Sequence, residues 1–271
     1  MSELLKAVVL GLVQGITEWL PVSSTAHLLL VDQFLHVGLG SRARELFFIV
    51  IQLSSILAIV ILYWSTLWPF GAKKDTAAKR SAWLLWTKII IATIPAAVLG
   101  FLLDDYLETH LQRWTVIASA LFCYGVLYIF LEKGPLGRAT RRVRSLKAIS
   151  YSDAILLGLF QTLALVPGTS RSGSTILGGI ILGLDRAVAA QFSFFMAIPI
   201  MAGASALKLI KLGFSYNRTE WAIMAVGFIT SFAVSMVVVK ALIAYIKSHD
   251  FSLFGGYRIL LSLAIVAVFI F

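Results

Sequence analysis

Long apolar segments recur along the whole chain, and they constrain its fold more than any other feature. Each is close to the roughly 17–25 residues that cross a bilayer as an α-helix. Only 13% of the 271 residues are charged, whereas soluble domains carry about 25%. The sequence therefore predicts an all-α integral membrane protein with six transmembrane helices, over Leu46–Trp64, Ile89–Leu103, Trp114–Phe130, Gln191–Leu207, Trp221–Val239 and Gly255–Phe271.

The positive charges are grouped between the predicted spans. The formal net charge is +10, with one basic group at residues 73–80 and another at residues 133–147. Basic loops beside spans follow the positive-inside rule, and they contact anionic lipid headgroups. Because no basic domain with interleaved aromatic residues exists outside the spans, we expect no nucleic-acid partner. We predict that both groups are cytoplasmic and that both termini are periplasmic or extracellular.

Two segments of the chain have similar sequences. GLVQGITEWLPVSST, which starts at Gly11, matches GLFQTLALVPGTSRS, which starts at Gly158. Downstream of each, RELFFIVIQLSSILA matches AQFSFFMAIPIMAGA at a similar spacing. The sequence therefore predicts two related halves within a single membrane domain. The domain covers residues 1–271. Within it, the first half is predicted at residues 1–132, a basic cytoplasmic loop at residues 133–150 and the second half at residues 151–271.

Each half is predicted to begin with a polar hairpin, at Leu4–His36 and at Ser152–Leu184. Neither arm of a hairpin is long enough to cross alone, and a proline joins the arms, so both read as re-entrant helix–loop–helix elements. Three spans per half is an odd number, so the second half is predicted to be inverted relative to the first. Irregular backbone and ionisable groups at membrane depth are tolerated where they are buried in protein or line a wet cavity. We expect the functional site where the two tips converge.

The first tip, QGITEWLPVSSTAH at residues 14–27, carries side chains suited to chemistry. Gln14 and Glu18 lie four residues apart on one face of the entering helix, which Pro21 ends. The returning helix begins with three hydroxyl residues, Ser23, Ser24 and Thr25. Backbone N–H groups at a helix start favour an anion. With His27 close to these serines, the tip offers a nucleophile, a proton-transfer group and an orienting group or metal ligand.

The second tip, PGTSRSGST at residues 167–175, has the composition of an anion site. Gly168 and Gly173 let the backbone approach a ligand closely. Arg171 presents a planar charged fork that suits phosphate. Hydroxyl groups come from Ser170, Ser172 and Thr175. The stretch is predicted to cradle phosphate, and it is not a Walker loop because that spacing is absent.

Simpler structural roles exist for the same residues. Hydroxyl groups near a proline often satisfy freed backbone carbonyls, which is an alternative for Ser23 and Thr25. His27 could be a hydrogen-bonded core histidine, and a neutral amide such as Gln14 can join helices. An arginine at membrane depth costs about 2.5–3.5 kcal/mol on insertion scales. We therefore predict functional roles for Arg171 and for Glu18.

Together, the two tips resemble the two signature motifs of the BacA/UppP family of bacterial undecaprenyl-diphosphatases, and the resemblance covers essentially the whole chain. It implies a multi-pass phosphatase of the bacterial inner membrane that converts undecaprenyl diphosphate to the monophosphate. This reaction would recycle the lipid carrier of cell-wall synthesis and confer bacitracin resistance. The expected partners are the lipid diphosphate in the bilayer, membrane lipids and a second copy in a homodimer.

The resemblance assigns roles residue by residue. Glu18 matches the second acidic residue of the first motif, and Ser24 and His27 match its catalytic hydroxyl and imidazole; Arg171 completes the catalytic set. The implied substrate-binding residues are Gln14, Ser23, Thr25, Gly168, Ser170, Ser172, Gly173 and Thr175. The resemblance also implies a divalent cation, magnesium or calcium, with Glu18 as a ligand. Some relatives carry glutamate where this chain has Gln14, so a metal site with two carboxylates stays open.

The expected reaction is phosphoryl transfer at the outer phosphate of the lipid diphosphate. In its loose transition state the protein mainly positions groups and neutralises charge. Ser24 is expected to attack, assisted by His27 or Glu18, and direct attack by water is the other route. A transporter is the alternative function, either a flippase for the polyprenyl phosphate or an ion-coupled carrier, because inverted repeats with broken helices are common in transporters.

Overall fold

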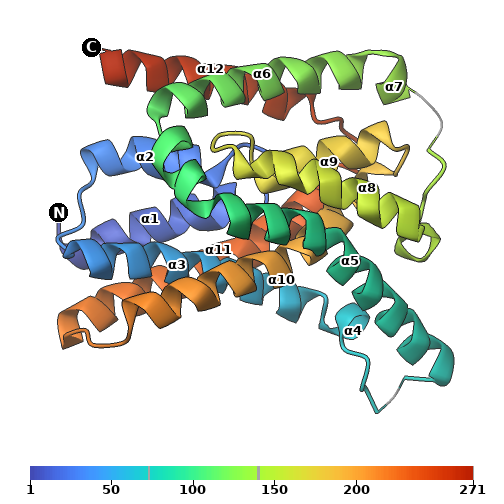
Figure 1. Cartoon of the computed structure of the whole chain (residues 1–271), viewed down its shortest axis with the longest axis horizontal. Helices are drawn as coiled ribbons and strands as arrows, with labels where there is room; N and C mark the ends of the chain where they lie inside the picture. Colours follow the sequence, from blue (N-terminus) through green and yellow to red (C-terminus); the bar gives the residue numbers. More distant parts are fainter. Residues whose placement is uncertain (73, 139–140, 271) are drawn as a thin grey trace.

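The computed structural model describes residues 1–72, 74–138 and 141–270, and these residues form an all-helical bundle (Figure 1). Six of its helices are long and apolar enough to cross a membrane, which confirms the six predicted spans. They are α3 (Ser41–Leu62), α5 (Thr76–Tyr106), α6 (Trp114–Lys133), α10 (Arg186–Leu212), α11 (Arg218–Tyr245) and α12 (Ser252–Ile270). Lys73 of the first basic group and Phe271 of the last predicted span lie outside the described residues.

α5 differs most from its predicted apolar segment, because it begins at Thr76 rather than Ile89. Asp75 caps the helix, and its carboxylate accepts a hydrogen bond from the N–H of Ala78 at 2.7 Å. Such a cap starts a helix regardless of hydropathy. An apolar segment therefore reports only part of the helix, because the turns before Ile89 also carry charged residues such as Lys79, Arg80 and Lys88.

Four further helices are too short to cross a bilayer. α1 (Glu3–Thr17) and α2 (Ser24–Phe34) have 15 and 11 residues, and α8 (Tyr151–Thr162) and α9 (Arg171–Ile181) have 12 and 11. At about 1.5 Å of rise per residue, none reaches the roughly 30 Å of the hydrocarbon core. We call α1 with α2 the first hairpin, and α8 with α9 the second hairpin. The remaining short elements are α4 (Trp64–Leu67), η1 (Leu107–Leu111), α7 (Pro135–Arg138), η2 (Leu146–Ala148) and η3 (Leu163–Leu165).

Each hairpin packs against a spanning helix from the other half of the chain. α1 lies along α11, and α8 lies along α5. Glycines permit both close approaches, since a Cβ at Gly11 would lie 2.8 Å from the carbonyl oxygen of Gly227, and one at Gly158 would lie 2.5 Å from that of Ala92. Gly11 and Gly158 are matched positions of the two repeated segments. The two hairpins therefore dock by the same local device.

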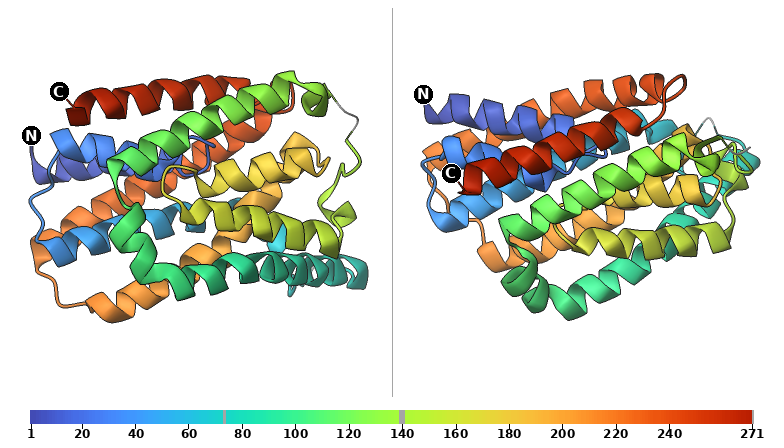
Figure 2. Two further views of the ribbon diagram at one scale, coloured as in Figure 1. Left: turned by 45° about the horizontal axis from the view of Figure 1, so that its top comes forward. Right: turned by 90° about the horizontal axis from the view of Figure 1, so that it is seen from above.

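Both chain termini lie at one end of the bundle, while α4, the start of α5 and α7 lie at the other end (Figures 1 and 2). The described parts of the two basic segments thus share one end of the molecule. α1 begins at the terminal end and α2 returns toward it, whereas α8 begins at the opposite end and α9 returns toward that end (Figure 1). The two hairpin tips consequently approach each other in the interior.

Candidate active site

Arg258 of α12 ties the two hairpin tips together inside the bundle. Its guanidinium donates hydrogen bonds to the carbonyl oxygens of Pro21 at 3.0 Å, Gly168 at 2.8 Å and Thr169 at 2.9 Å. The side chain is fully buried, and it lies over the ring of Tyr124 at 5.4 Å from the centroid. Because Pro21 belongs to the first tip and the other two acceptors to the second, one side chain fixes the tips relative to each other.

Hydroxyl groups of the second tip add further internal links. The hydroxyl of Ser172 donates to the carbonyl oxygen of Leu20 at 3.1 Å and approaches that of Glu18 at 3.4 Å. The hydroxyl oxygen of Thr175 lies 2.6 Å from that of Ser193 on α10. Both Ser172 and Thr175 are buried. Their hydroxyls, which the sequence assigned to phosphate, are satisfied within the protein and hold the tip in place.

Glu18 is the centre of a polar cluster that we call the Glu18 cluster, formed by Gln14, Glu18, Ser24 and Arg171. One carboxylate oxygen, Oε2, accepts hydrogen bonds from the Gln14 amide at 3.1 Å and from the Ser24 hydroxyl at 2.8 Å. The other, Oε1, lies 3.4 Å from Nη2 of Arg171. Glu18 is buried. The cluster therefore brings a hydroxyl, a carboxylate and a guanidinium together from both hairpins.

Helix termini explain how these side chains meet. Glu18 follows the last turn of α1, and its N–H bonds to the carbonyl oxygen of Gln14 at 3.0 Å, which keeps the two side chains on one face. Ser24 and Arg171 are the first residues of α2 and α9. The two helices start at the point where the tips touch, so their first side chains and exposed N–H groups face a shared space.

The two helix starts share an unusual backbone conformation. Ser23 and Ser170 precede α2 and α9, and each has a φ of 71°, the two positive values outside glycine among the described residues. Each serine also caps its helix, because its hydroxyl oxygen accepts a hydrogen bond from a backbone N–H, that of Ala26 at 3.4 Å or that of Gly173 at 3.1 Å. Such a conformation costs about 1–3 kcal/mol and persists only where the surroundings enforce it. The tips are therefore held in shape by their contacts.

Arg171 has one buried donor that no group among the described residues uses. Its Nη1 donates to the carbonyl oxygen of Ser193 at 2.8 Å, and its guanidinium lies 5.5 Å from the centroid of the Trp19 ring. Its Nε is buried without a hydrogen-bond partner among the described residues. A buried orphan donor on a guanidinium, beside the Ser24 hydroxyl of the same cluster, suits a ligand rich in acceptor oxygens, such as a phosphate.

His27 lies near Ser24 in the sequence but bonds elsewhere. Its Nδ1 lies 2.8 Å from the carbonyl oxygen of Ser23, and its Nε2 lies 2.7 Å from the hydroxyl of Tyr257 on α12. The imidazole also stacks on the Tyr257 ring, with centroids 5.5 Å apart. Both ring nitrogens are thus engaged. Of the two bases that the sequence offered for Ser24, the structure puts Glu18 in hydrogen-bond contact with it.

The other predicted binding residues have varied surroundings. Thr25 is exposed on α2, next to the cluster in sequence but outside its hydrogen bonds. Ser170 lies with its hydroxyl oxygen 3.1 Å from that of Ser172, and its cap holds Gly173 close. Gly168 has a φ of 95°, and a Cβ there would lie 2.5 Å from a backbone oxygen. These residues shape the second tip, and Arg171 extends from it toward Glu18.

Three residues of this region were not singled out from the sequence: Ser193, Tyr257 and Arg258. A signal existed for Arg258, because an arginine inside a predicted apolar span marks a functional position. Ser193 and Tyr257 carried no such signal. A serine and a tyrosine in membrane helices are common, and only the folded chain brings them to Arg171 and His27.

The donor set limits the kind of cation that this site can hold. Within the described residues, no three His, Cys, Asp or Glu side chains gather where they could bind a metal ion. The cluster offers one carboxylate, that of Glu18, beside the amide of Gln14. Magnesium in phosphate sites is held by one or two carboxylates together with substrate phosphate oxygens. The residues therefore fit a cation bound jointly with a phosphate ligand, and they do not form an all-protein cage.

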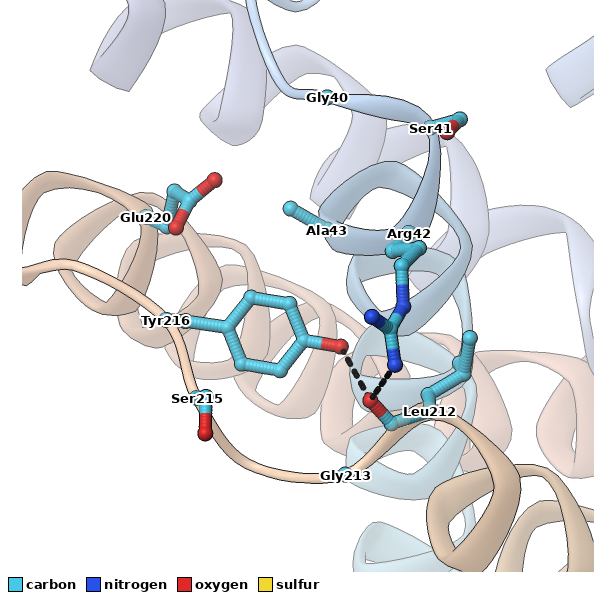
Figure 3. Close-up of a pocket in the computed structure, with 9 residues that line it drawn as sticks. All are labelled: Gly40, Ser41, Arg42, Ala43, Leu212, Gly213, Ser215, Tyr216 and Glu220. Atoms are coloured by element: carbon cyan, nitrogen blue, oxygen red, sulfur yellow. Dashed lines mark hydrogen bonds between the residues drawn. The ribbon is translucent and has the colours of Figure 1, made fainter.

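A cavity of about 400 Å³ lies between the start of α3 and the turn that joins α10 to α11 (Figure 3). This end of the bundle also carries the termini (Figure 1). Arg42 of α3 and Tyr216 both donate to the carbonyl oxygen of Leu212, at 3.0 and 3.3 Å. Glu220 also lines the cavity, so its charged groups have opposite signs. It shares no residue with the Glu18 cluster.

Comparison with known proteins identifies close relatives over the full length of the chain. Residues 7–264 match the family model described as bacitracin resistance protein BacA. The undecaprenyl-diphosphatase 1 of Clostridioides difficile (strain 630) is 49% identical over 99% of this chain and 97% of its own length. The undecaprenyl-diphosphatase of Enterococcus faecalis is 46% identical over 98% of this chain and 97% of its own length. That of Acetivibrio thermocellus is 46% identical over 100% of this chain and 99% of its own length.

Proposed function

Because the chain belongs to the bacitracin resistance protein BacA family, we infer that it is an undecaprenyl-diphosphatase, which dephosphorylates undecaprenyl diphosphate to undecaprenyl phosphate. The observation that carries the inference is the convergence of Glu18, Ser24 and Arg171, with contacts of 2.8 and 3.4 Å. A hydroxyl, a base and a phosphate-binding guanidinium are what phosphoryl transfer to a serine requires. The reaction returns the lipid carrier to cell-wall synthesis, and this recycling confers bacitracin resistance.

We assign Ser24 as the nucleophile and Glu18 as its base. The Ser24 Oγ attacks the outer phosphorus and gives its proton to Oε2 of Glu18, the acceptor of its hydrogen bond. The bond from phosphorus to the bridging oxygen breaks, and the departing undecaprenyl phosphate takes that proton. Water then attacks the phospho-serine, and Glu18 passes a proton from this water to the serine oxygen as inorganic phosphate leaves. Direct attack by water, with Ser24 only binding, is the alternative route.

Charge neutralisation falls to Arg171 and the helix starts. The Nε of Arg171, which has no partner among the described residues, can donate to a phosphoryl oxygen, and Nη2 of Arg171 already lies against Glu18. Backbone N–H groups at the starts of α2 and α9 add positive potential. We also propose a divalent cation, magnesium or calcium, with Glu18 and Gln14 as protein ligands. When bound, it would offset the negative charge of the diphosphate.

Purified protein in detergent should release inorganic phosphate from undecaprenyl diphosphate. This measurement separates the phosphatase from the rival transporter, a flippase or ion-coupled carrier, because detergent micelles offer no second compartment. A preparation that binds the lipid but releases no phosphate, with and without added magnesium or calcium, would favour the transporter. Omitting the cation in the same assay tests the proposed cofactor.

Replacing Arg171 by lysine should lower phosphate release far more than the retained charge suggests. An ammonium keeps the charge but loses the planar fork. Losing one charge-assisted hydrogen bond costs about 1.5–3 kcal/mol, or roughly 10- to 150-fold in rate if it acts in the transition state. Arg113→Lys, an exposed change outside the cluster, is the matched control. Near-normal turnover of Arg171→Lys would limit Arg171 to a structural role.

We propose that both hairpins are re-entrant and that the two halves are inverted copies. The short lengths of their helices, their entry from opposite ends and the shared φ of 71° at Ser23 and Ser170 support this arrangement. The positive-inside rule then directs residues 74–80 and 141–147 to the cytoplasm and both termini to the outside of a bacterial inner membrane. Residues 139 and 140, between the two predicted halves, lie outside the described residues. Assembly as a homodimer stays a prediction.

Cysteine labelling of intact cells should report this orientation. Cys123 is the single cysteine of the chain, so Cys123→Ala gives a background without thiols. An impermeant thiol reagent should label Ser215→Cys, near the α10–α11 turn, in intact cells. It should label Thr76→Cys, at the start of α5, only after the cells are permeabilised. The reverse pattern would invert the proposed topology.

A further inference from the structure

A second cavity lies at the end of the bundle opposite the termini, where α4 and the start of α5 meet the segment before α8 (Figure 1). Its volume is about 440 Å³. Three lysines line it, Lys74, Lys88 and Lys147, together with the hydroxyl residues Ser65, Thr66 and Ser81. None of the described residues that line it is acidic. In this respect it differs from the cavity of Figure 3, whose lining includes both the cationic Arg42 and the anionic Glu220.

Lys88 makes this cavity more than a surface hollow. It belongs to the spanning helix α5, and only 9% of it is exposed. Its ammonium donates to the carbonyl oxygen of Lys147 at 3.3 Å and lies 5.9 Å from the centroid of the Tyr151 ring. In the described part of the chain, no carboxylate pairs with it. An ammonium has three donors, so the wall of the cavity holds a buried cation with unused hydrogen-bonding capacity.

The other walls complete an environment for an amphipathic anion. Lys74 donates to the carbonyl oxygen of Trp68 at 2.6 Å, which fixes its ammonium at the rim. Lys147 is exposed at the same cavity. Leu84 also lines it and is half-exposed on α5, so the cavity continues onto the apolar outer surface of the bundle. Clustered ammonium groups and hydroxyls bind phosphate, while an apolar edge suits a hydrocarbon chain.

We propose that this cavity, which we call the lysine pocket, binds a phosphate group, either the monoester of an isoprenoid lipid or free inorganic phosphate. Lys88 would provide the central charge, with Lys74 and Lys147 at the rim. An anion there would give Lys88 the partner that the described part of the protein does not supply. The pocket shares no residue with the Glu18 cluster, so this proposal stands whether or not Ser24 is a nucleophile.

Binding is measured by equilibrium dialysis of the full-length protein in detergent, with farnesyl phosphate and inorganic phosphate as separate probes. All variants carry Arg171→Ala, which weakens anion binding at the Glu18 cluster. Lys88→Met keeps the volume and removes the charge, and it should weaken binding of the phosphate probe by about 10-fold or more, as expected for one charge-assisted contact. Lys79→Met is the matched control, because Lys79 is exposed on α5 and does not line the pocket.

The outcomes separate the two sources of phosphate. A lipid ligand is supported if farnesyl phosphate binds while inorganic phosphate neither binds nor displaces it. Free phosphate is supported if inorganic phosphate displaces farnesyl phosphate at equal concentration. Equal affinities of Lys88→Met and Lys79→Met for both probes would overturn the proposal. Lys88→Arg should restore binding, since it restores the charge. If Lys88→Met fails to fold, the double change Lys74→Gln with Lys147→Gln at the rim carries the same test.

Discussion

Replacing Ser24 by alanine should abolish phosphate release from undecaprenyl diphosphate and leave the fold intact. The Ser24 hydroxyl is bonded to Glu18 at 2.8 Å, and its removal leaves that carboxylate with Gln14 and Arg171. Losing one hydrogen bond to a carboxylate costs about 1.5–3 kcal/mol of stability, whereas losing the nucleophile removes the covalent route. Phosphate release and thermal unfolding in detergent measure the two effects. Activity above about a tenth of wild type, a loss under about 1.4 kcal/mol, would instead favour attack by water.

Matched variants assign the roles around this serine. Thr25→Ala removes an exposed hydroxyl one residue away and should retain nearly full activity. Glu18→Gln should be as harmful as Ser24→Ala, because the amide cannot take the serine proton. His27→Gln should be milder, since His27 bonds to Ser23 and Tyr257. A larger loss for His27→Gln than for Glu18→Gln would identify the imidazole as the base.

Replacing Arg258 by methionine should lower both activity and thermal stability. The change would strand the carbonyl oxygens of Pro21, Gly168 and Thr169, which now accept its hydrogen bonds. Each buried acceptor left unpaired costs about 1–3 kcal/mol. Removing a buried charge recovers some desolvation energy, but three stranded carbonyls outweigh it. We expect at least about 3 kcal/mol of destabilisation and, because the tips separate, a loss of activity of about 100-fold or more.

Arg258→Lys separates positioning from charge. It keeps the cation and reaches one acceptor at most, so kcat should fall more than KM rises. Arg113→Met, at the exposed residue that precedes α6, controls for the loss of an arginine. If Arg258→Met kept wild-type activity and unfolding temperature, the joint between the two tips would not depend on this residue.

The six spans and the breaks between the short helices were predictable because each rests on local properties. The length of an apolar segment predicts a membrane helix, and Pro21 predicts a helix break whatever the path of the chain after it. Glu18, Ser24 and Arg171 could be singled out because polar and charged groups at membrane depth are energetically costly. The partner of Ser24 could not be predicted, since both His27 and Glu18 are near it along the chain. The structure separates them through Tyr257, which is 230 residues away from His27 and invisible to any local pattern.

Arg258 and Lys88 show a different limit. Both lie in or beside predicted apolar spans, and their cost at membrane depth was a usable signal. What they contact was not, because Arg258 reaches Pro21 across 237 residues and Lys88 reaches Lys147 across 59. A buried cation can be located from a sequence, while its acceptors are set by how the helices pack.

Ser24 and Arg171 stand at the same place in the two hairpins, each the first residue of its helix after a capping serine with a φ of 71°. Two identical halves would put the same side chain at both places. The product would be a pair of nucleophiles without a cation, or a pair of cations without a nucleophile. If the halves are the inverted copies proposed above, joining them in one chain lets serine stand in one and arginine in the other, which two copies of one identical chain could not do. Divergence of the proposed copies after their fusion would then account for a site that has one nucleophile and one cation.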